Sequence, residues 1–235
     1  MTRSESAWRR LGRDRFGQGA KSDDVRARAL PSGVTHWEGP GLEAWEPWTP
    51  HEARLTLGDV GVSWCVVGGW AIDLFVGAQT RPHDDLEIAV LREDFDAVRE
   101  GLRAFEMYSV GDGEVRRLSV GHRPAVDKHQ NWVLDPARQR WRADVMLEPG
   151  DAATWVFRRD ETIQAERSRM IQRTVDGIPY LSPMGTLLFK AKTSRPKDHA
   201  DFEACLPRLS SDERAWLRHA LELVHPRHSW IGQIT

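Results

Sequence analysis

The hydrophobic and polar positions of residues 60–110 follow two periods, one typical of strands and one typical of helices. Residues 62–67 form a short apolar run with β-branched members, which predicts a buried strand. Apolar residues recur at helical spacing over 70–75 and again over 93–105, so each segment predicts a helix. Between them, residues 84–90 alternate acidic with apolar side chains, which predicts a strand with one polar face. This order indicates a fold that mixes strands and helices.

The C-terminal half divides into a strand-rich part and a helical part. Less regular strands are predicted over 107–148, most clearly at 141–147. Beyond residue 180, helix-start signals precede segments with apolar residues at helical spacing. The predicted helices begin at Ser182-Pro183 and run through Ala191, extend from about Lys197 to Leu206, and begin at the capping box Ser210-x-x-Glu213.

Residues 1–48 differ from the rest of the chain. Residues 1–30 are charged and poor in large aliphatic side chains, which predicts a partly mobile tail or a surface helix with a basic cluster at Arg9, Arg10, Arg13 and Arg15. Residues 31–50 are rich in Pro, Gly and Trp, which predicts an extended segment held onto the domain by Trp37, Trp45 and Trp48. A capping box at Thr49, with Pro50 after it, predicts the first helix of the compact region. We therefore predict an N-terminal extension over 1–48, a mixed domain over 49–180 and a helical subdomain over 181–235.

Composition excludes several classes of protein. The 235 residues carry 33 basic and 35 acidic side chains, and this balance offers no electrostatic basis for general nucleic-acid or membrane binding. No apolar run approaches the roughly 20 residues that a membrane span needs, and the N-terminus lacks the apolar stretch of a secretory signal. The only two cysteines, Cys65 and Cys205, are far apart, which argues against a disulfide framework. We expect a soluble cytoplasmic protein.

The clearest chemistry lies on the strand predicted over 84–90. Asp85 and Glu87 are two residues apart, so on a strand they point to one face while Leu86 and Ile88 point into the core. Neighbouring carboxylates repel unless a cation lies between them, and carboxylate oxygens are ligands that Mg²⁺ prefers. This pair is therefore a candidate metal site, and an acidic solvent-facing strand is the alternative.

A second candidate feature is the pair Gly68-Gly69 before the helix predicted over 70–75. Glycine lets a phosphate approach the backbone closely, and the free N–H groups at a helix start favour anions. A tight turn that simply needs glycine is the alternative.

Together the residues GGWAIDLFVG and TRPHDDLEI resemble the nucleotidyltransferases of the DNA polymerase β superfamily, and within it the aminoglycoside 2″-adenylyltransferase and lincosamide nucleotidyltransferase branch. Members have a Gly-Gly or Gly-Ser turn, a strand with an acidic-x-acidic pair, and a third acidic residue on a later strand. Asp144 in WRADVM is the best match for this third residue, and Glu148 competes with it. Glu87 stands where many relatives carry Asp. The segment LLFKAKTSRPKDHADFEACL resembles the helical half of such enzymes, whereas residues 1–45 match no part of them.

The resemblance implies an α+β, polymerase-β-like nucleotidyltransferase fold, in which a mixed twisted sheet flanked by helices precedes a small helical bundle. It implies a Mg²⁺-dependent enzyme, using one or two ions, that moves a nucleoside monophosphate from an NTP, ATP foremost, to a hydroxyl. The acceptor would be a small molecule such as an aminoglycoside- or lincosamide-like antibiotic, and pyrophosphate would be released. The implied metal ligands and catalytic residues are Asp85, Glu87 and Asp144, with Asp144 also a candidate general base; the implied nucleotide contacts are Gly68, Gly69, Arg81, His83, Lys190 and Lys197.

Two other functions remain open from the sequence. One is a toxin-like nucleotidyltransferase that modifies tRNA or protein, for which the arginines between Arg9 and Arg15 would supply a basic acceptor surface. The other is an inert nucleotide-binding module that keeps the fold. Asp73 is expected to tie the glycine turn to its neighbours by hydrogen bonds, and Trp132 and Trp141 are candidates to line an acceptor pocket.

Overall fold

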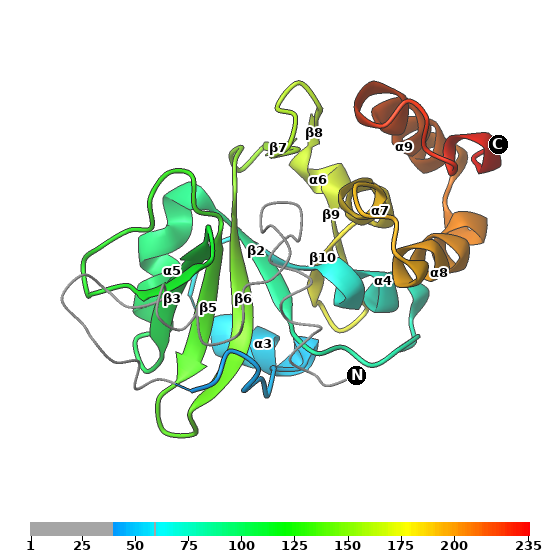
Figure 1. The fold of residues 1–235 in the computed structure, drawn as a ribbon. Helices are drawn as coiled ribbons and strands as arrows, with labels where there is room; N and C mark the ends of the chain where they lie inside the picture. Colours follow the sequence, from blue (N-terminus) through cyan, green and yellow to red (C-terminus); the bar gives the residue numbers. More distant parts are fainter. Residues whose placement is uncertain (1–39, 59) are drawn as a thin grey trace. The chain divides into compact units, whose positions relative to one another are not determined.

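The computed structural model describes residues 40–58 and 60–235 (Figure 1). The predicted N-terminal tail, its arginine cluster and Trp37 lie outside these residues. Contacts between Cα atoms divide the chain into two compact units. Unit 1 holds the described residues up to Ser63 together with Asp84–Leu147, and unit 2 holds Trp64–His83 and Glu148–Thr235. The domain boundaries expected at residues 48/49 and 180/181 stay predictions.

Unit 1 contains five strands hydrogen-bonded in the order β4-β3-β5-β6-β2, in which the pairs β4/β3, β3/β5 and β5/β6 are antiparallel. The strands are β2 Glu87–Leu91, β3 Glu106–Gly111, β4 Glu114–Arg117, β5 Gln130–Asp135 and β6 Arg140–Glu148. Its helices are α3 Pro50–Leu57 and α5 Phe95–Gly101, the latter preceded by the 3₁₀ turn η2 Arg92–Asp94 (Figure 1). The predicted capping box of α3 is present, since Thr49 and Glu52 each accept the other's backbone N–H.

Two predicted elements of unit 1 differ in length from the observed ones. The helix expected over 93–105 ends at Gly101, a residue type that lowers helical stability, although Phe95, Val98 and Leu102 are buried as predicted. Strand β2 begins at Glu87 rather than at residue 84. The predicted alternation of exposure holds over residues 85–88 only, because Ile88 to Leu91 are all buried.

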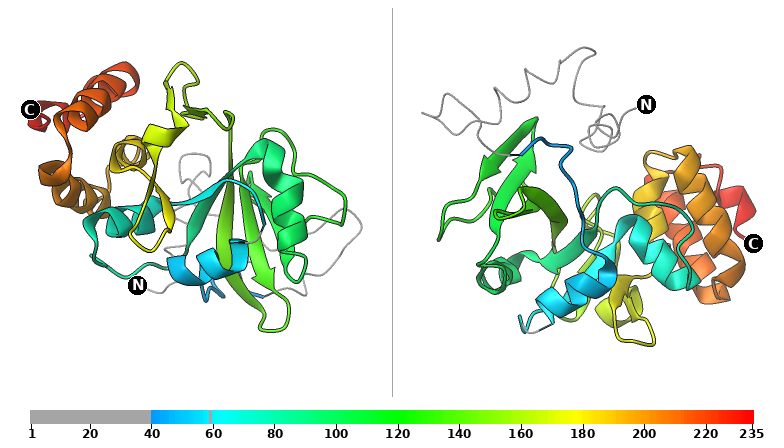
Figure 2. Two further views of the ribbon diagram at one scale, coloured as in Figure 1. Left: turned by 180° about the vertical axis from the view of Figure 1, so that it is seen from behind. Right: turned by 90° about the horizontal axis from the view of Figure 1, so that it is seen from below.

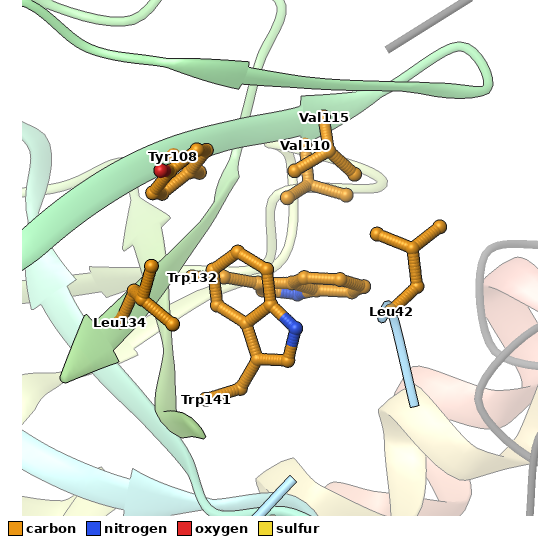
Figure 3. Close-up of a cluster of buried hydrophobic side chains, with 7 residues drawn as sticks. All are labelled: Leu42, Tyr108, Val110, Val115, Trp132, Leu134 and Trp141. Atoms are coloured by element: carbon orange, nitrogen blue, oxygen red, sulfur yellow. The ribbon is translucent and has the colours of Figure 1, made fainter. Parts of the chain in front are cut away.

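One face of this sheet carries an aromatic cluster. Val133 pairs with Ala143 but Leu134 pairs with Trp141, so Arg142 is an extra residue in β6. This bulge lets Trp141 point to the same face as Trp132. Trp132 pairs with Asp144, and in a regular strand Trp141, three residues from Asp144, would face the opposite side. The cluster consists of Leu42, Tyr108, Val110, Val115, Trp132, Leu134 and Trp141 (Figure 3).

The segment before α3 covers this cluster and adds a short length of backbone pairing to β6. Trp141 N donates to Ala44 O at 3.0 Å, Glu46 N donates to Trp141 O at 3.1 Å, and Trp48 N donates to Arg142 O at 2.9 Å. The Trp45 ring packs edge-on against Trp132, with centroids 5.1 Å apart. The predicted role of Trp45 and Trp48 in holding this segment onto the domain is confirmed.

Unit 2 combines two small sheets with a group of helices. Strand β1 (Trp64–Val67) pairs in parallel with β10 (Pro179–Leu181), and β10 pairs antiparallel with β9 (Ile171–Arg173). Separately, β7 (Thr154–Val156) pairs antiparallel with β8 (Gln164–Glu166). Helix α7 contacts α4, α8 and α9, and Figures 1 and 2 show these helices gathered together. The predicted caps at Ser182 and Ser210 are both present. The helices are α4 Gly68–Val76, α6 Arg167–Met170, α7 Pro183–Ala191, α8 Pro196–Cys205 and α9 Ser211–Val224, with the 3₁₀ turns η3 Leu206–Arg208 and η4 Ile231–Gln233.

The predicted α+β class is confirmed by this mixture of sheets and helices. Within the described part of the chain, no helix combines the length and apolar character that crossing a membrane requires.

Candidate active site

Of the predicted acidic residues of unit 1, Glu87 begins β2, Asp85 lies two residues before that strand, and Asp144 lies on β6. Leu86 and Ile88 are fully buried, whereas Asp85 and Glu87 are half-buried, so both carboxylates point away from the core. Asp144 lies on β6, and its N–H donates to Leu86 O at 2.8 Å. The third carboxylate is therefore hydrogen-bonded, through its backbone, to the residue that separates the other two.

Asp144 is itself 3% exposed and oriented by a neighbour. Gln130 Nε2 donates to Asp144 Oδ2 at 2.8 Å from the adjacent strand β5. Asp144 is paired with Trp132 across β5 and β6, so the carboxylate and the aromatic cluster occupy the same face of the sheet. Sequence reasoning missed Gln130, because only the pairing of β5 with β6 brings the two side chains together.

Glu148, the competing third carboxylate, is engaged elsewhere. It belongs to unit 2, where its Oε1 lies 2.6 Å from Arg167 Nη2 and both side chains are buried. Burial raises the pKa of Glu148, and the charge of Arg167 opposes this rise only in part. Glu148 thus already has a buried partner, and the assignment of Asp144 as the third acidic residue stays a prediction.

The carboxylates of unit 1 fit Mg²⁺ in their chemistry, since all three candidate ligands supply hard oxygen atoms. A preformed cluster is not present: among residues 40–58 and 60–235, no three His, Cys, Asp or Glu side chains are grouped so that they could hold a metal ion. The ion would have to draw the half-buried Asp85 and Glu87 side chains toward Asp144.

In unit 2 the diglycine forms the first turn of α4 rather than a separate loop. Gly68 has a φ of 70°, a conformation that favours glycine, and Val67 at the N-cap supplies no side-chain hydrogen bond to the turn. A Cβ on Gly69 would lie 2.4 Å from Arg81 Nη2 and 2.6 Å from His83 Nδ1. The first glycine is thus needed for its backbone conformation, and the second for the close approach of two side chains.

Those two side chains belong to a hydrogen-bond network that begins at Asp73. Asp73 Oδ1 accepts from Thr80 N at 3.0 Å and from Thr80 Oγ1 at 2.5 Å, and Asp73 Oδ2 lies 2.5 Å from His83 Nε2. Arg81 Nη1 lies 3.1 Å from His83 Nδ1. Burial lowers the pKa of His83, and the bond to Asp73 opposes this shift. A neutral ring that donates from Nε2 to Asp73 and accepts at Nδ1 from Arg81 satisfies both contacts. The hydrogen bonds of Asp73 thus hold residues 80–83, and Arg81 and His83 in turn pack against Gly69.

The network continues from Arg81 into the C-terminal helices. Arg81 Nη2 lies 3.4 Å from Asp201 Oδ2, and Lys190 Nζ lies 2.7 Å from the same oxygen and 3.5 Å from Asp198 Oδ1. Burial alone would raise the pKa of Asp198, but hydrogen bonds from Arg195 and the charges of Lys190 and Arg195 outweigh it and lower that pKa. Lys190 is 8% exposed and its charge is already partnered.

The structure therefore gathers the sequence-predicted site residues into two groups. Unit 1 brings Asp144 beside Leu86, the residue between Asp85 and Glu87. Unit 2 brings Gly69, Arg81 and His83 into contact, and links Lys190 to Arg81 through Asp201. Lys197 is half-buried on α8, and its predicted contact with a nucleotide stays a prediction.

Comparison with known proteins identifies one family. The family model described as aminoglycoside-2″-adenylyltransferase matches residues 52–204, well over half of the chain. A search of curated protein sequences finds no match. Segment 41–48, which covers the aromatic cluster, precedes the matched region.

Similar solved structures include the antibiotic-resistance factor ANT(2″)-Ia in complex with adenylyl-2″-tobramycin, at 13% identity and a TM-score of 0.49, with 74% of this chain and 95% of that chain covered. They also include the lincosamide antibiotic adenylyltransferase LnuA bound to lincomycin, at 16% identity and a TM-score of 0.46, with coverages of 66% and 92%. A nucleotidyltransferase-like protein from Paracoccidioides brasiliensis aligns at 14% identity and a TM-score of 0.42, with coverages of 79% and 89%.

The match to the family model over residues 52–204 confirms the resemblance drawn from the glycine turn and the acidic strand, and with it a nucleotidyltransferase fold and enzyme class. The chain belongs to the aminoglycoside 2″-adenylyltransferase family.

Proposed function

We propose that this protein is a Mg²⁺-dependent adenylyltransferase that acts on a hydroxyl group of an aminoglycoside- or lincosamide-like antibiotic. The observation that carries the proposal is the hydrogen bond from Asp144 N to Leu86 O. This bond supports the proposal, because metal-assisted transfer of a nucleotide would use a third carboxylate next to Asp85 and Glu87. Family membership supports the reaction class.

The residues divide the work between charge neutralisation and positioning. Asp85, Glu87 and Asp144 would hold one or two Mg²⁺ ions, which neutralise the triphosphate and orient the attacking and leaving oxygens when bound. Asp144 would also accept the proton of the acceptor hydroxyl, with Gln130 holding its carboxylate in place. The first turn of α4 and Arg81 would receive the triphosphate, because free helix N–H groups and a guanidinium both bind phosphate oxygens.

The reaction balances without further reactants. The acceptor oxygen attacks the α-phosphorus of ATP, a phosphate ester bond forms, the bond to the β-phosphate oxygen breaks, and pyrophosphate leaves. The hydroxyl proton passes to the general base.

The test is transfer of labelled nucleotide from ATP and other NTPs to a panel of aminoglycosides and lincosamides in the presence of Mg²⁺. We expect Asp85→Asn and Asp144→Asn each to lower kcat by at least about a hundredfold, since each removes several kcal/mol of charge stabilisation. Asp212→Asn, at an exposed carboxylate in the first turn of α9, is the matched control and should leave transfer unchanged. Glu148→Gln separates the two candidates for the third acidic residue. Full activity in Asp85→Asn, or transfer that depends on Glu148 and not on Asp144, would contradict the assignment.

A further inference from the structure

We infer that Asp73 and Asp201 are positioning residues, which hold Arg81 against the glycine turn so that its guanidinium meets the triphosphate. The inference rests on the proposed function, because it assigns a role to the network that surrounds the proposed phosphate site. Asp73 and Asp201 would act through Arg81 and would contact neither the nucleotide nor the metal.

The exposure of the network's members points to Arg81 as its functional end. The side chains of Asp73, His83 and Asp201 are each 3–4% exposed, and that of Lys190 is 8% exposed. Arg81 is 24% exposed and touches the position where a Cβ of Gly69 would be. The network reaches a second accessible cation through Asp198, namely Arg195 at the start of α8, but Arg81 is the one that lies at the glycine turn. An accessible cation held by buried polar groups at a helix start is suited to meeting an anion.

His83 connects Asp73 to Arg81 in a defined orientation. The ring is held on one side by Asp73 through Nε2, and it lies over the indole of Trp70 with centroids 4.5 Å apart. Its Nδ1 is thereby directed at Arg81 Nη1 as an acceptor. Without the carboxylate of Asp73, the Nε2–H of His83 loses its acceptor, and the ring is no longer held in the orientation that meets Arg81.

Asp201 holds the other guanidinium nitrogen and is itself fixed by Lys190. The contact from Lys190 to Asp201 Oδ2 is 2.7 Å, whereas the contact from Arg81 Nη2 is 3.4 Å. Arg81 is thus the more weakly held of the two cations, and a phosphate oxygen would compete for it more readily than for Lys190. In this role Lys190 acts through Asp201 and does not contact the nucleotide.

Burial of so many charges argues for a role other than stability. Removing charged groups from water costs free energy that ion pairing only partly repays, so a buried ionic network adds little net stability. Its geometric specificity, in contrast, is suited to fixing Arg81 at the mouth of the glycine turn.

The experiment is a double-mutant cycle with binding of ATP and Mg²⁺ measured by calorimetry. Arg81→Ala, Asp73→Asn and Asp201→Asn should each weaken binding by about tenfold, the loss expected for one charge-assisted contact. Asp73→Asn combined with Arg81→Ala should bind no more weakly than Arg81→Ala alone. In transfer assays, Asp73→Asn should raise KM for ATP by the same factor and change kcat by less than about threefold. Additive losses would overturn the inference, because they would show that Asp73 does not act through Arg81.

A second measurement does not depend on catalysis. Nitrogen-15 NMR of the histidine side chains, taken above the pKa of His83, should show the Nε2–H tautomer, and the Nδ1 resonance should shift in Arg81→Ala. Asp212→Asn should leave both unchanged. An Nδ1–H tautomer would overturn the inference whatever the enzyme does. A wild-type protein that binds no NTP would instead overturn the proposed function, and the NMR result would then decide separately whether the network orients Arg81.

Discussion

A methyl group at position 69 should displace the two side chains that converge there. Gly69 lies in the first turn of α4 and has no positive φ, so Ala is compatible with its backbone. The added Cβ would, however, stand 2.4 Å from Arg81 Nη2 and 2.6 Å from His83 Cε1 and Nδ1. The first contact is with the end of a flexible side chain, and the second is with a ring that packs against Trp70 at a tilt of 32°.

The expected loss follows from these contacts. Forcing an extra carbon into a packed site costs about 1–3 kcal/mol, and replacing Gly by Ala within a helix returns up to about 1 kcal/mol. We therefore expect Gly69→Ala to lower the free energy of unfolding by about 1–2 kcal/mol. Because Arg81 must move, ATP binding should weaken by about tenfold as well.

Urea unfolding and calorimetry measure the two effects separately. Gly232→Ala is the matched control, since a Cβ there meets nothing within 4 Å, and its unfolding free energy should stay within about 0.5 kcal/mol of wild type. His83→Ala should cost less stability in the Gly69→Ala background than in wild type, because it removes the clash. A Gly69→Ala protein as stable as wild type would show that the ring and the guanidinium do not pack on this turn.

Three further predictions concern other buried groups. Arg167→Met should lower the free energy of unfolding, measured by urea denaturation, by about 3–5 kcal/mol, because Glu148 would stay buried without its cation. A loss below about 1 kcal/mol would refute this. Burial lowers the pKa of His228. As the pH falls, this histidine therefore binds a proton in the unfolded chain before it does so in the native state. The native protein should keep its full stability above pH 6.5, the ordinary pKa of histidine, and lose stability as the pH falls below that value. Urea midpoints on either side of pH 6.5 should show this decline, and His228→Gln should reduce it. Cys65 and Cys205 are fully buried, and burial raises the pKa of Cys205 to about 12. Neither thiol of the native protein should therefore react with an aromatic disulfide reagent until the protein unfolds. Rapid reaction of either thiol in the native protein would contradict this.

Much of the local structure could be predicted because its causes are local. In the capping boxes at Thr49 and Ser210, both hydrogen-bonding residues lie within four positions of each other. The residue types at those positions are therefore nearly sufficient to predict the hydrogen bonds. The alternation of Asp85 and Glu87 with buried neighbours follows from the period of a strand, whichever strand lies beside it. The boundaries were less predictable, since the helix expected to reach residue 105 ends at Gly101.

The site itself depended on contacts between residues far apart in the chain. The family resemblance offered Asp144 and Glu148 as candidates for the third acidic residue. Only the structure shows that Asp144 donates its N–H to Leu86 while Glu148 pairs with Arg167, a difference that supports the proposal of Asp144. The role of Gln130 required the pairing of two strands whose register no single strand reveals.

By itself, the sequence determined the chemistry available to this protein: an acidic strand, a glycine turn at a helix start and a family pattern that joins them. Only the tertiary structure decided which groups meet. It showed that Gly69 is small because Arg81 and His83 pack against it, and that Lys190 is paired with Asp201. Residue type and spacing set what a side chain is able to do, whereas its partners are chosen by packing between segments that the chain order does not place together.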